Sequence, residues 1–341
     1  MVRYTAGRKG VSREVCPPVL RAGCAKGYRY DVDAVTTTPH LLPALEHYHR
    51  LRPDAKIYIL PPPASSPHPP KAYNTTALKP ALDTCRVYKS PHEISLIRRA
   101  NAITASAHAA VLRSLPFARN ESHLEAAYTS VCIRLFAKAQ AYDPIIGGGT
   151  NAATLHYVRN NVPLKREGLV LVDAGCEWEG YTSDVTRTFP VSGQFSREQK
   201  EVYQLVQEMQ DACISRTIAG ADFRDVHWHA HRVCLQGLLR LGILRGGEEE
   251  VWVAGTTRAF FPHGLGHMLG LDVHDVELPG WGMMGEEGVY DAIEYSLHGK
   301  TVAPRVLEKD MVVTVEPGMY APLSPLWIQL LMLVDTSPGL L

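Results

Sequence analysis

The chain has 341 residues, of which 45% are hydrophobic and 21% charged, as in a folded globular protein long enough for two domains. Its 35 basic and 35 acidic residues cancel, and no block of like charge stands out, which argues against nucleic acid or an acidic membrane surface as the main partner. No apolar run is long enough to span a bilayer, and the N-terminus lacks the apolar segment of a signal peptide.

The first 84 residues combine short apolar runs with polar turns. Residues 56–63 (KIYILPPP) predict a strand that ends at prolines, and residues 61–75 have the Pro- and Ser-rich composition of a loop or linker. We therefore predict a partial N-terminal domain with a proline-rich linker over 1–84, and a second domain over 85–341.

A helical pattern begins after the linker. Ser90 and Glu93 have the spacing of a capping box, with Pro91 at the first helical position. Apolar residues then recur at helical spacing, at Ile94, Ile97, Ala100, Ile103 and Ala107. Further helices are predicted over about 122–139, from near Ser196, and from near Asp222. The three histidines at 227, 229 and 231 are interpreted as surface residues of the last of these helices.

Between the second and third helices the hydrophobic period changes to two, which predicts strands over 141–158, 169–175 and 182–191. Residues 177–181 (EWEGY) supply a turn, so the last two strands are expected to form a hairpin. Three glycines at 147–149 favour a substrate-cleft loop over a phosphate loop, because neither phosphate-binding motif follows them. Helices and strands that are grouped rather than alternating indicate an α+β fold.

The predicted hairpin carries two acidic residues. Asp173 ends a strand of buried type, and Asp184 lies eleven residues further on, so a short turn can bring both carboxylates to one face. Two buried carboxylates repel each other, and a divalent cation removes that repulsion. Taken alone, Asp173 is better interpreted as a residue of a strand-end turn than as a metal ligand.

Three histidines, His263, His267 and His274, recur within twelve residues, among glycines that permit close backbone approach. Glu316 follows a predicted strand at 311–315 (MVVTV) and precedes a Pro-Gly turn. Carboxylates with one imidazole suit ions such as Mn²⁺, Co²⁺ or Zn²⁺. The spacing alone is compatible with a metal site and also with hydrogen-bonded polar residues in a turn-rich region.

The seven cysteines are an odd number and include no CxxC pair, which indicates buried, reduced thiols and favours the cytoplasm. Cys132 and Cys176 lie in apolar segments without the neighbours of a nucleophile.

Four segments, YDPIIGGGTNAATLHY, DAGCEWEGYTSDVTRTFP, HGLGHMLGLDVHD and TVEPGMY, occur in an order that resembles the pita-bread metallopeptidases of the creatinase and methionine aminopeptidase type. The resemblance extends from about Cys85 to Tyr320 and is greatest to the proline-specific branch M24B, Xaa-Pro aminopeptidase (aminopeptidase P) and prolidase. It implies an α+β pita-bread fold with helices outside a curved antiparallel sheet. It also implies a cytoplasmic hydrolase that cleaves Xaa-Pro bonds in peptides or dipeptides, with a homodimer as a candidate assembly.

The resemblance further implies a role for each residue of the motifs. Two Mn²⁺ ions per subunit would share a hydroxide, with Asp173 on one metal and Asp184 bridging both. His267 and Glu316 would bind the other metal, and Glu316 would also move a proton. His156 would line the substrate pocket, and His263 and His274 would contact the substrate and the developing oxyanion.

The chain departs from the family after Tyr320, where a second bridging glutamate is expected in a strand G-x-R-x-E-D. The last residues, 321–341, contain neither Glu nor Arg, so we expect a truncated or altered end, a missing closing strand and one firmly held ion. The alternative is an impaired or inactive member that acts as a binding module. A metal-free amidinohydrolase is disfavoured, because four ligand positions would be superfluous there. Residues 276–300 resemble an insertion and are interpreted as a solvated loop.

Overall fold

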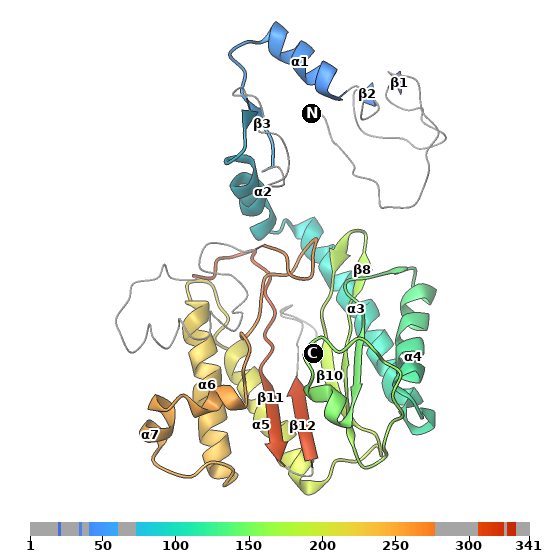
Figure 1. The fold of residues 1–341 in the computed structure, drawn as a ribbon, viewed down its shortest axis with the longest axis vertical. Coiled ribbons are helices and arrows are strands. Elements are labelled where there is room, and N and C mark those ends of the chain that lie inside the picture. The colour runs from blue at the N-terminus through green and yellow to red at the C-terminus, as the bar shows by residue number, and fades with distance from the viewer. Residues whose placement is uncertain are drawn as a thin grey trace. The chain divides into compact units, whose positions relative to one another are not determined.

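The computed structural model describes residues 41–60, 73–276 and 306–323, and the short strands at 20–21, 34–35 and 326–331. The chain forms two compact units, Met1–Pro80 and Ala81–Leu341 (Figure 1). The domain division predicted at residue 84 stays a prediction. The predicted solvated loop lies almost wholly outside the described residues, as does most of the proline-rich linker.

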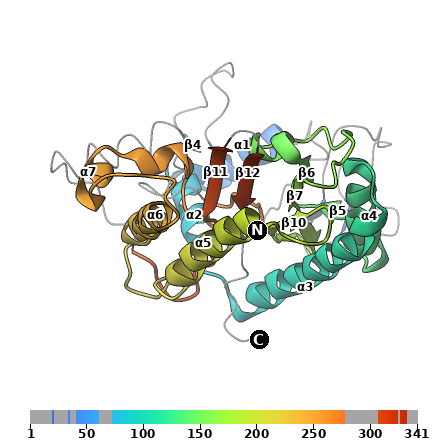
Figure 2. The same cartoon turned by 90° about the horizontal axis from the view of Figure 1, so that it is seen from below.

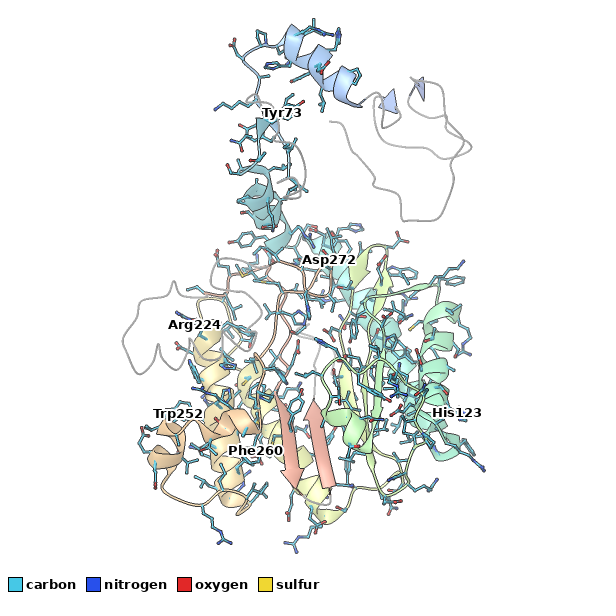
Figure 3. All side chains as sticks on the ribbon, in the orientation of Figure 1. Tyr73, His123, Arg224, Trp252, Phe260 and Asp272 are labelled. Atoms are coloured by element: carbon cyan, nitrogen blue, oxygen red, sulfur yellow. The ribbon has the colours of Figure 1, made fainter. Side chains whose placement is uncertain are left out.

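The first unit contains little regular structure among its described residues. Strand β1 (Leu20–Arg21) pairs antiparallel with β2 (Ala34–Val35), and helix α1 (Leu41–Leu51) follows. Strand β3 (Ile57–Tyr58) pairs in parallel with β4 (Tyr73–Asn74), whose first residue is labelled in Figure 3. The strand predicted before the linker is therefore present, but it is only two residues long.

Most helices belong to the second unit. The α-helices are α2 (Leu78–Val87), which begins in the first unit, α3 (Pro91–Ser114), α4 (Glu121–Arg134), α5 (Arg197–Ile214), α6 (Phe223–Arg240) and α7 (Glu248–Val253). The 3₁₀ turns are η2 (Leu115–Phe117), η3 (Gly149–Ala153) and η4 (Thr256–Ala259). Helix α3 packs against α4 and α5 packs against α6, and Figure 2 shows α3 and α5 along one side of the strands. None of the helices that the structure describes is both long and apolar enough to cross a membrane.

The predicted helix starts are confirmed by their caps. The Ser90 hydroxyl accepts from the Glu93 N–H (3.3 Å), and the Ser90 N–H donates to the Glu93 carboxylate (2.7 Å). Ser196 and Gln199 form the same reciprocal box at the start of α5, and the Asp222 side chain caps α6. Helix α4 is shorter than predicted and ends at Arg134. The chain turns through a left-handed residue, Phe136 (φ 69°), because the following segment extends into a strand.

Antiparallel strands form the centre of the second unit. One sheet has the order β10–β7–β6, with β6 at Ile145–Gly148, β7 at Leu169–Asp173 and β10 at Thr186–Pro190. The other has the order β5–β8–β9, with β5 at Ala139–Gln140, β8 at Cys176–Trp178 and β9 at Tyr181–Thr182. The predicted hairpin is confirmed, since β7 pairs with β10 and the β8–β9 turn lies between them. The strand predicted over 141–158 is present only as β6, because η3 follows it at once.

Two expectations about the last part of the chain are wrong. Strand β11 (Gly318–Leu323) pairs antiparallel with β12 (Leu326–Leu331), so a strand does follow β11, contrary to the expected loss of a closing strand. The strand predicted at 311–315 is not a regular strand, and Val313 alone forms an isolated bridge, with Met268. The Tyr320 N–H donates to the carbonyl of Phe260 (2.7 Å), which is labelled in Figure 3, and this bond ties β11 to the end of η4.

Two hydrophobic clusters fill the second unit. The first joins α3 and α4 to β6 and β7, through residues that include Ile103, Leu124, Ile146, Val170 and Val172. The second joins α5 and α6 to the segments at 261–268 and 313–319, through residues that include Val206, Met209, Leu238, Phe261 and Val315. Burial of each such side chain stabilises the fold by about 1.5–3 kcal/mol.

The interpretation of the three α6 histidines as surface residues is wrong for two of them. His227 and His231 are buried, because residues four apart on a helix share one face. Their face packs on Phe261, with which the His231 ring stacks at 4.8 Å between centroids. The His231 Nδ1 atom lies 2.9 Å from the Thr257 hydroxyl, so the ring is hydrogen-bonded as well as packed.

Candidate metal centre

The β7–β10 hairpin brings two carboxylates together. Asp173 is the last residue of β7 and lies opposite Thr186 of β10, while Asp184 lies in the short segment that leads into β10. The hydroxyl of Tyr142 donates to Oδ1 of Asp173 (2.5 Å) and also lies 2.7 Å from Oδ1 of Asp184. One hydroxyl therefore spans both carboxylates, which places them on the same side of the hairpin.

The other two proposed ligands come from segments that are far apart in the chain. Residues 265–269 run antiparallel to residues 312–316, although neither segment is a regular strand. Three backbone bonds join them, from Leu269 N to Val312 O (3.1 Å), from Thr314 N to His267 O (2.9 Å), and from Glu316 N to Leu265 O (2.6 Å). These bonds place His267 and Glu316 next to each other.

Three ligand atoms converge on one point. His267 Nε2 lies 2.9 Å from Glu316 Oε1 and 3.3 Å from Asp184 Oδ2. One ligand atom from each of these three residues lies within 4.8 Å of the other two, the sole such group among the residues described. His267 Nδ1 lies 3.0 Å from the carbonyl of Met268, so an N–H on Nδ1 leaves Nε2 facing the carboxylates. Asp173 joins this group through Tyr142.

Burial and the charges of neighbouring groups shift the pKa values of this acid-rich set. Burial, together with the charge of Asp184, raises the pKa of Asp173 well above its usual range. Burial alone would lower the pKa of His267, but the charges of Glu316 and Asp184 raise it well above its usual value. Burial would raise the pKa of Glu316, and its contacts with His267 lower it below the usual value. Three carboxylates and one imidazole are a donor set that a divalent cation fits and would neutralise.

Two of the histidines predicted to contact substrate, His263 and His274, lie near this group. The rings of His274 and His267 lie 4.3 Å apart, at an angle of 74°. His263 Nδ1 lies 2.8 Å from the carbonyl of Gly264, while its buried Nε2 has no hydrogen-bond partner among the described residues. Burial lowers the pKa of both His263 and His274, and the charge of His156 lowers both further. The three imidazoles therefore share one electrostatic neighbourhood.

The loop that carries His274 is held by ion pairs. The side chain of Asp275 is buried and accepts from Lys89 Nζ (3.0 Å) and from the Arg86 guanidinium. The same guanidinium lies 2.5 Å from Asp272, which is labelled in Figure 3. A buried carboxylate with two cationic partners fixes the backbone next to His274.

Sequence reasoning missed two residues of this site. Tyr142 precedes the Asp-Pro pair before β6, and nothing in its local sequence distinguishes it from a core tyrosine. Thr314 donates its hydroxyl proton to Glu316 and accepts from the backbone N–H of His267 (3.0 Å). Its position two residues before Glu316 was an available signal, since alternate residues of an extended segment share a face.

Other residues considered from sequence supply no atom to this converging group. Gly147 and Gly148 belong to β6, and Gly149 (φ 58°) begins η3. Cys132 and Cys176 are buried free thiols, as predicted. A hydrogen bond with Cys132 lowers the pKa of Cys176 to about 7. Among the described cysteines Cys85 is exposed, contrary to expectation.

Comparison with known proteins follows the same residues. The profile of metallopeptidase family M24 matches residues 95–334. A probable Xaa-Pro aminopeptidase of Sclerotinia sclerotiorum is 44% identical over 321 residues, which cover 86% of this chain and 57% of that protein. A probable Xaa-Pro aminopeptidase of Botryotinia fuckeliana is 42% identical over 323 residues, with the same coverage of 86% and 57%.

Among solved structures, Escherichia coli aminopeptidase P with the inhibitor Pro-Leu has a TM-score of 0.67 at 34% identity, over 78% of this chain and 58% of that one. A substitution variant of the same enzyme in complex with substrate also gives 0.67 at 34%, over 78% and 57%. The predicted pita-bread fold is thereby confirmed. The chain spans about 57% of the length of the curated relatives named above.

Proposed function

This chain belongs to metallopeptidase family M24, and we propose that it is a metal-dependent exopeptidase that hydrolyses Xaa-Pro bonds. The observation that carries the proposal is the convergence of Asp184, His267 and Glu316, with Asp173 linked to them through Tyr142. The substrates are peptides with proline in the second position, and the relatives named as aminopeptidases favour them over Xaa-Pro dipeptides.

The family depends on a divalent metal, and we assign the ligands from the donor atoms described above. Asp184, His267 and Glu316 would hold one cation, and Asp173 with Asp184 would contribute to a second. Mn²⁺ suits a set of carboxylates with one imidazole. A cation bound here would polarise the scissile carbonyl and lower the pKa of an attacking water.

The side chains around the ligands prepare them for this task. The contact of His267 Nδ1 with Met268 fixes the ring so that Nε2 faces the carboxylates. The Thr314 hydroxyl holds one oxygen of Glu316, which leaves its carboxylate oriented to accept and return a proton.

The histidines supply substrate contacts. A peptide bond before proline has no N–H, so the enzyme must recognise the ring by shape and hold the carbonyl oxygen. His263 offers a buried Nε2 without a described partner; because Nδ1–H donates to the carbonyl of Gly264, Nε2 of the neutral ring can accept a hydrogen bond from the substrate. His274 and His156 would add two further imidazoles beside the substrate. The lowered pKa values of His263 and His274 keep those two rings neutral at pH 7.

The alternative is an impaired member that binds peptides without cleaving them. One observation favours it: the residues of β12, Leu326–Leu331, include no carboxylate. We do not favour it, because proteins named as aminopeptidases match 86% of the chain at 42–44% identity. The observation instead leads us to expect one cation bound more weakly than the other. A cytoplasmic location and a homodimer stay predictions.

Metal analysis and peptide hydrolysis on the purified chain test the proposal. We expect Xaa-Pro peptides to be cleaved with Mn²⁺ and matched Xaa-Ala peptides to be cleaved at least about 100-fold more slowly. Substitution His267→Ala should weaken metal binding by on the order of 100-fold or more, because it removes a ligand. His229→Ala, a half-buried histidine of α6, is the matched control. Metal-loaded protein that binds Xaa-Pro peptides and leaves them intact would favour the alternative.

A further inference from the structure

A buried carboxylate outside the proposed ligand set holds a loop of the site together. Glu121 is the first residue of α4 and is fully buried. Its Oε1 accepts from Gly148 N (2.8 Å) and Asn151 Nδ2 (3.0 Å), and its Oε2 accepts from the Tyr157 hydroxyl (2.8 Å) and Val162 N (2.9 Å). All of these donors belong to residues 148–162, which run from the last residue of β6 into its connection to β7.

The charge of Glu121 depends on this loop. No described basic side chain forms an ion pair with the carboxylate, so the four donors and the N-terminus of α4 are what stabilise it. A buried charge that loses such donors is strongly destabilised. The loop and the carboxylate therefore hold each other in one arrangement.

The loop carries His156, one of the histidines proposed to contact substrate. His156 is exposed and has φ 54°, in the left-handed region that a non-glycine residue occupies only when its neighbours hold it there. The next residue, Tyr157, is buried, and its hydroxyl is bonded to Glu121 and to Asn151 (3.1 Å). The anchor thus acts on the residue adjacent to the strained one.

We propose that Glu121 is a positioning residue which, through Tyr157, holds His156 toward the substrate. This inference rests on the proposed Xaa-Pro hydrolysis, because that function gives His156 its task. Glu121 lies on α4, the helix on which His123 is labelled in Figure 3, and it contacts no proposed metal ligand in the described structure. Its loss should therefore weaken substrate binding more than metal binding.

Two substitutions remove the anchor to different extents. Tyr157→Phe removes one bond to the carboxylate and keeps the ring, so KM should rise about 10-fold. Glu121→Gln replaces one acceptor oxygen with an NH₂ group that must face an N–H donor of the loop, so KM should rise about 30-fold or more. In both variants kcat should stay within about 3-fold of the unsubstituted chain, and metal content should be unchanged.

The matched control is Tyr181→Phe. Tyr181 donates its hydroxyl proton to Glu93 (2.7 Å), so this change also removes a tyrosine–glutamate bond, at a place outside the loop. It should leave KM unchanged. Hydrogen exchange of the backbone supplies a readout that does not need catalysis. Residues 149–158 should exchange at least about 10-fold faster in Tyr157→Phe and Glu121→Gln and at the original rate in Tyr181→Phe.

The outcomes separate this inference from the proposed function. If the unsubstituted chain cleaves no Xaa-Pro peptide, the proposed function fails, and calorimetric binding of the dipeptide Pro-Leu to the Mn²⁺-loaded chain replaces KM. Weaker binding in the two loop variants, with faster exchange of 149–158, supports the inference. Unchanged KM or dipeptide binding, absence of dipeptide binding by the unsubstituted chain, or an equal loss of metal and substrate binding would each overturn it.

Discussion

The two walls of the site present ligands of the same kind by different means. The carboxylate wall is the β7–β10 hairpin, a regular antiparallel ladder that ends at Asp173, with Asp184 in the segment that leads into β10. The histidine wall consists of residues 265–269 and 312–316, which carry His267 and Glu316 on irregular backbone joined by individual hydrogen bonds. A regular ladder fixes its side chains through many neighbours, whereas the histidine wall depends on a few contacts.

Each wall contains one glycine at a point of close approach. A Cβ on Gly175 would lie 1.7 Å from the carbonyl oxygen of Ser183, and a Cβ on Gly266 would lie 2.1 Å from that of Thr314. Both obstacles are backbone atoms, so neither can move aside as a side chain would. Thr314 contacts both His267 and Glu316, so a shift there would reach two ligands at once.

The largest expected effect is that of Gly266→Ala, because this substitution lies in the histidine wall, which depends on few contacts. The added methyl group must push residues 265–269 away from 312–316, so the free energy of unfolding should fall by about 3 kcal/mol. Metal binding should fall as well, because His267 and Glu316 separate. Denaturant unfolding and metal titration measure the two losses.

Gly247→Ala is the control for that substitution. A Cβ added at Gly247 would lie 4.0 Å from Glu250 Cβ, which is an ordinary van der Waals distance. It should cost at most about 1 kcal/mol, the scale of a change at a helix cap. Equal metal affinity in Gly266→Ala and the unsubstituted chain would show that the histidine wall does not depend on this contact.

The two walls also differ in how far the sequence predicts them. The carboxylate wall follows from a period of two and a short turn, because both are local, and its hairpin is confirmed. In the histidine wall the sequence indicates His267 and Glu316 as candidate ligands, yet the strand predicted at 311–315 is not formed. That apolar run is buried by packing on α5 and α6, and burial alone does not require a ladder.

Contacts between distant residues account for the rest. Tyr142 reaches Asp173 and Asp184 across 31 and 42 residues of sequence, and such pairing depends on the whole fold. The burial of His227 and His231 likewise depends on Phe261, which sequence periodicity does not bring to α6. Local patterns therefore predict the elements, and tertiary packing decides which polar side chains become part of the site.

A buried histidine lies behind each wall, and acid should affect both. Burial lowers the pKa of His108, whose Nε2 lies 3.4 Å from the carbonyl of Ala174, to about 4. Burial, together with the charges of His263 and Arg258, lowers the pKa of His231 to about 3. Because the unfolded chain binds these protons near pH 6.5, each histidine contributes stability above that pH, which is lost as the pH falls toward the folded-state pKa.

The expected effect of intermediate size is the loss of stability in acid that these two buried histidines cause. Between pH 7 and pH 5 each histidine should account for a loss of about 2 kcal/mol in the free energy of unfolding. His231→Gln or His108→Gln should each reduce the pH dependence by about that amount, measured by denaturant unfolding across the range. A slope that neither substitution changes would assign acid sensitivity to other groups and would leave the two walls indistinguishable in this respect.

The smallest expected effect concerns the link between the carboxylates. Tyr142→Phe removes the hydroxyl that spans Asp173 and Asp184, and leaves both walls and the packing of the ring in place. Metal affinity should fall about 10-fold, the usual scale for a residue that orients ligands without binding the metal. Isothermal titration with Mn²⁺ measures the change.

Tyr128→Phe provides the comparison, because Tyr128 is also buried and its hydroxyl lies 3.2 Å from that of Thr104 rather than on a carboxylate. This variant should lose a similar hydrogen bond in stability and keep the original metal affinity. If both variants bind Mn²⁺ equally well, the backbone of the β7–β10 hairpin alone orients Asp173 and Asp184. Local structure would then account for the whole carboxylate wall, without the long-range contact of Tyr142. The histidine wall would still depend on individual contacts between distant segments.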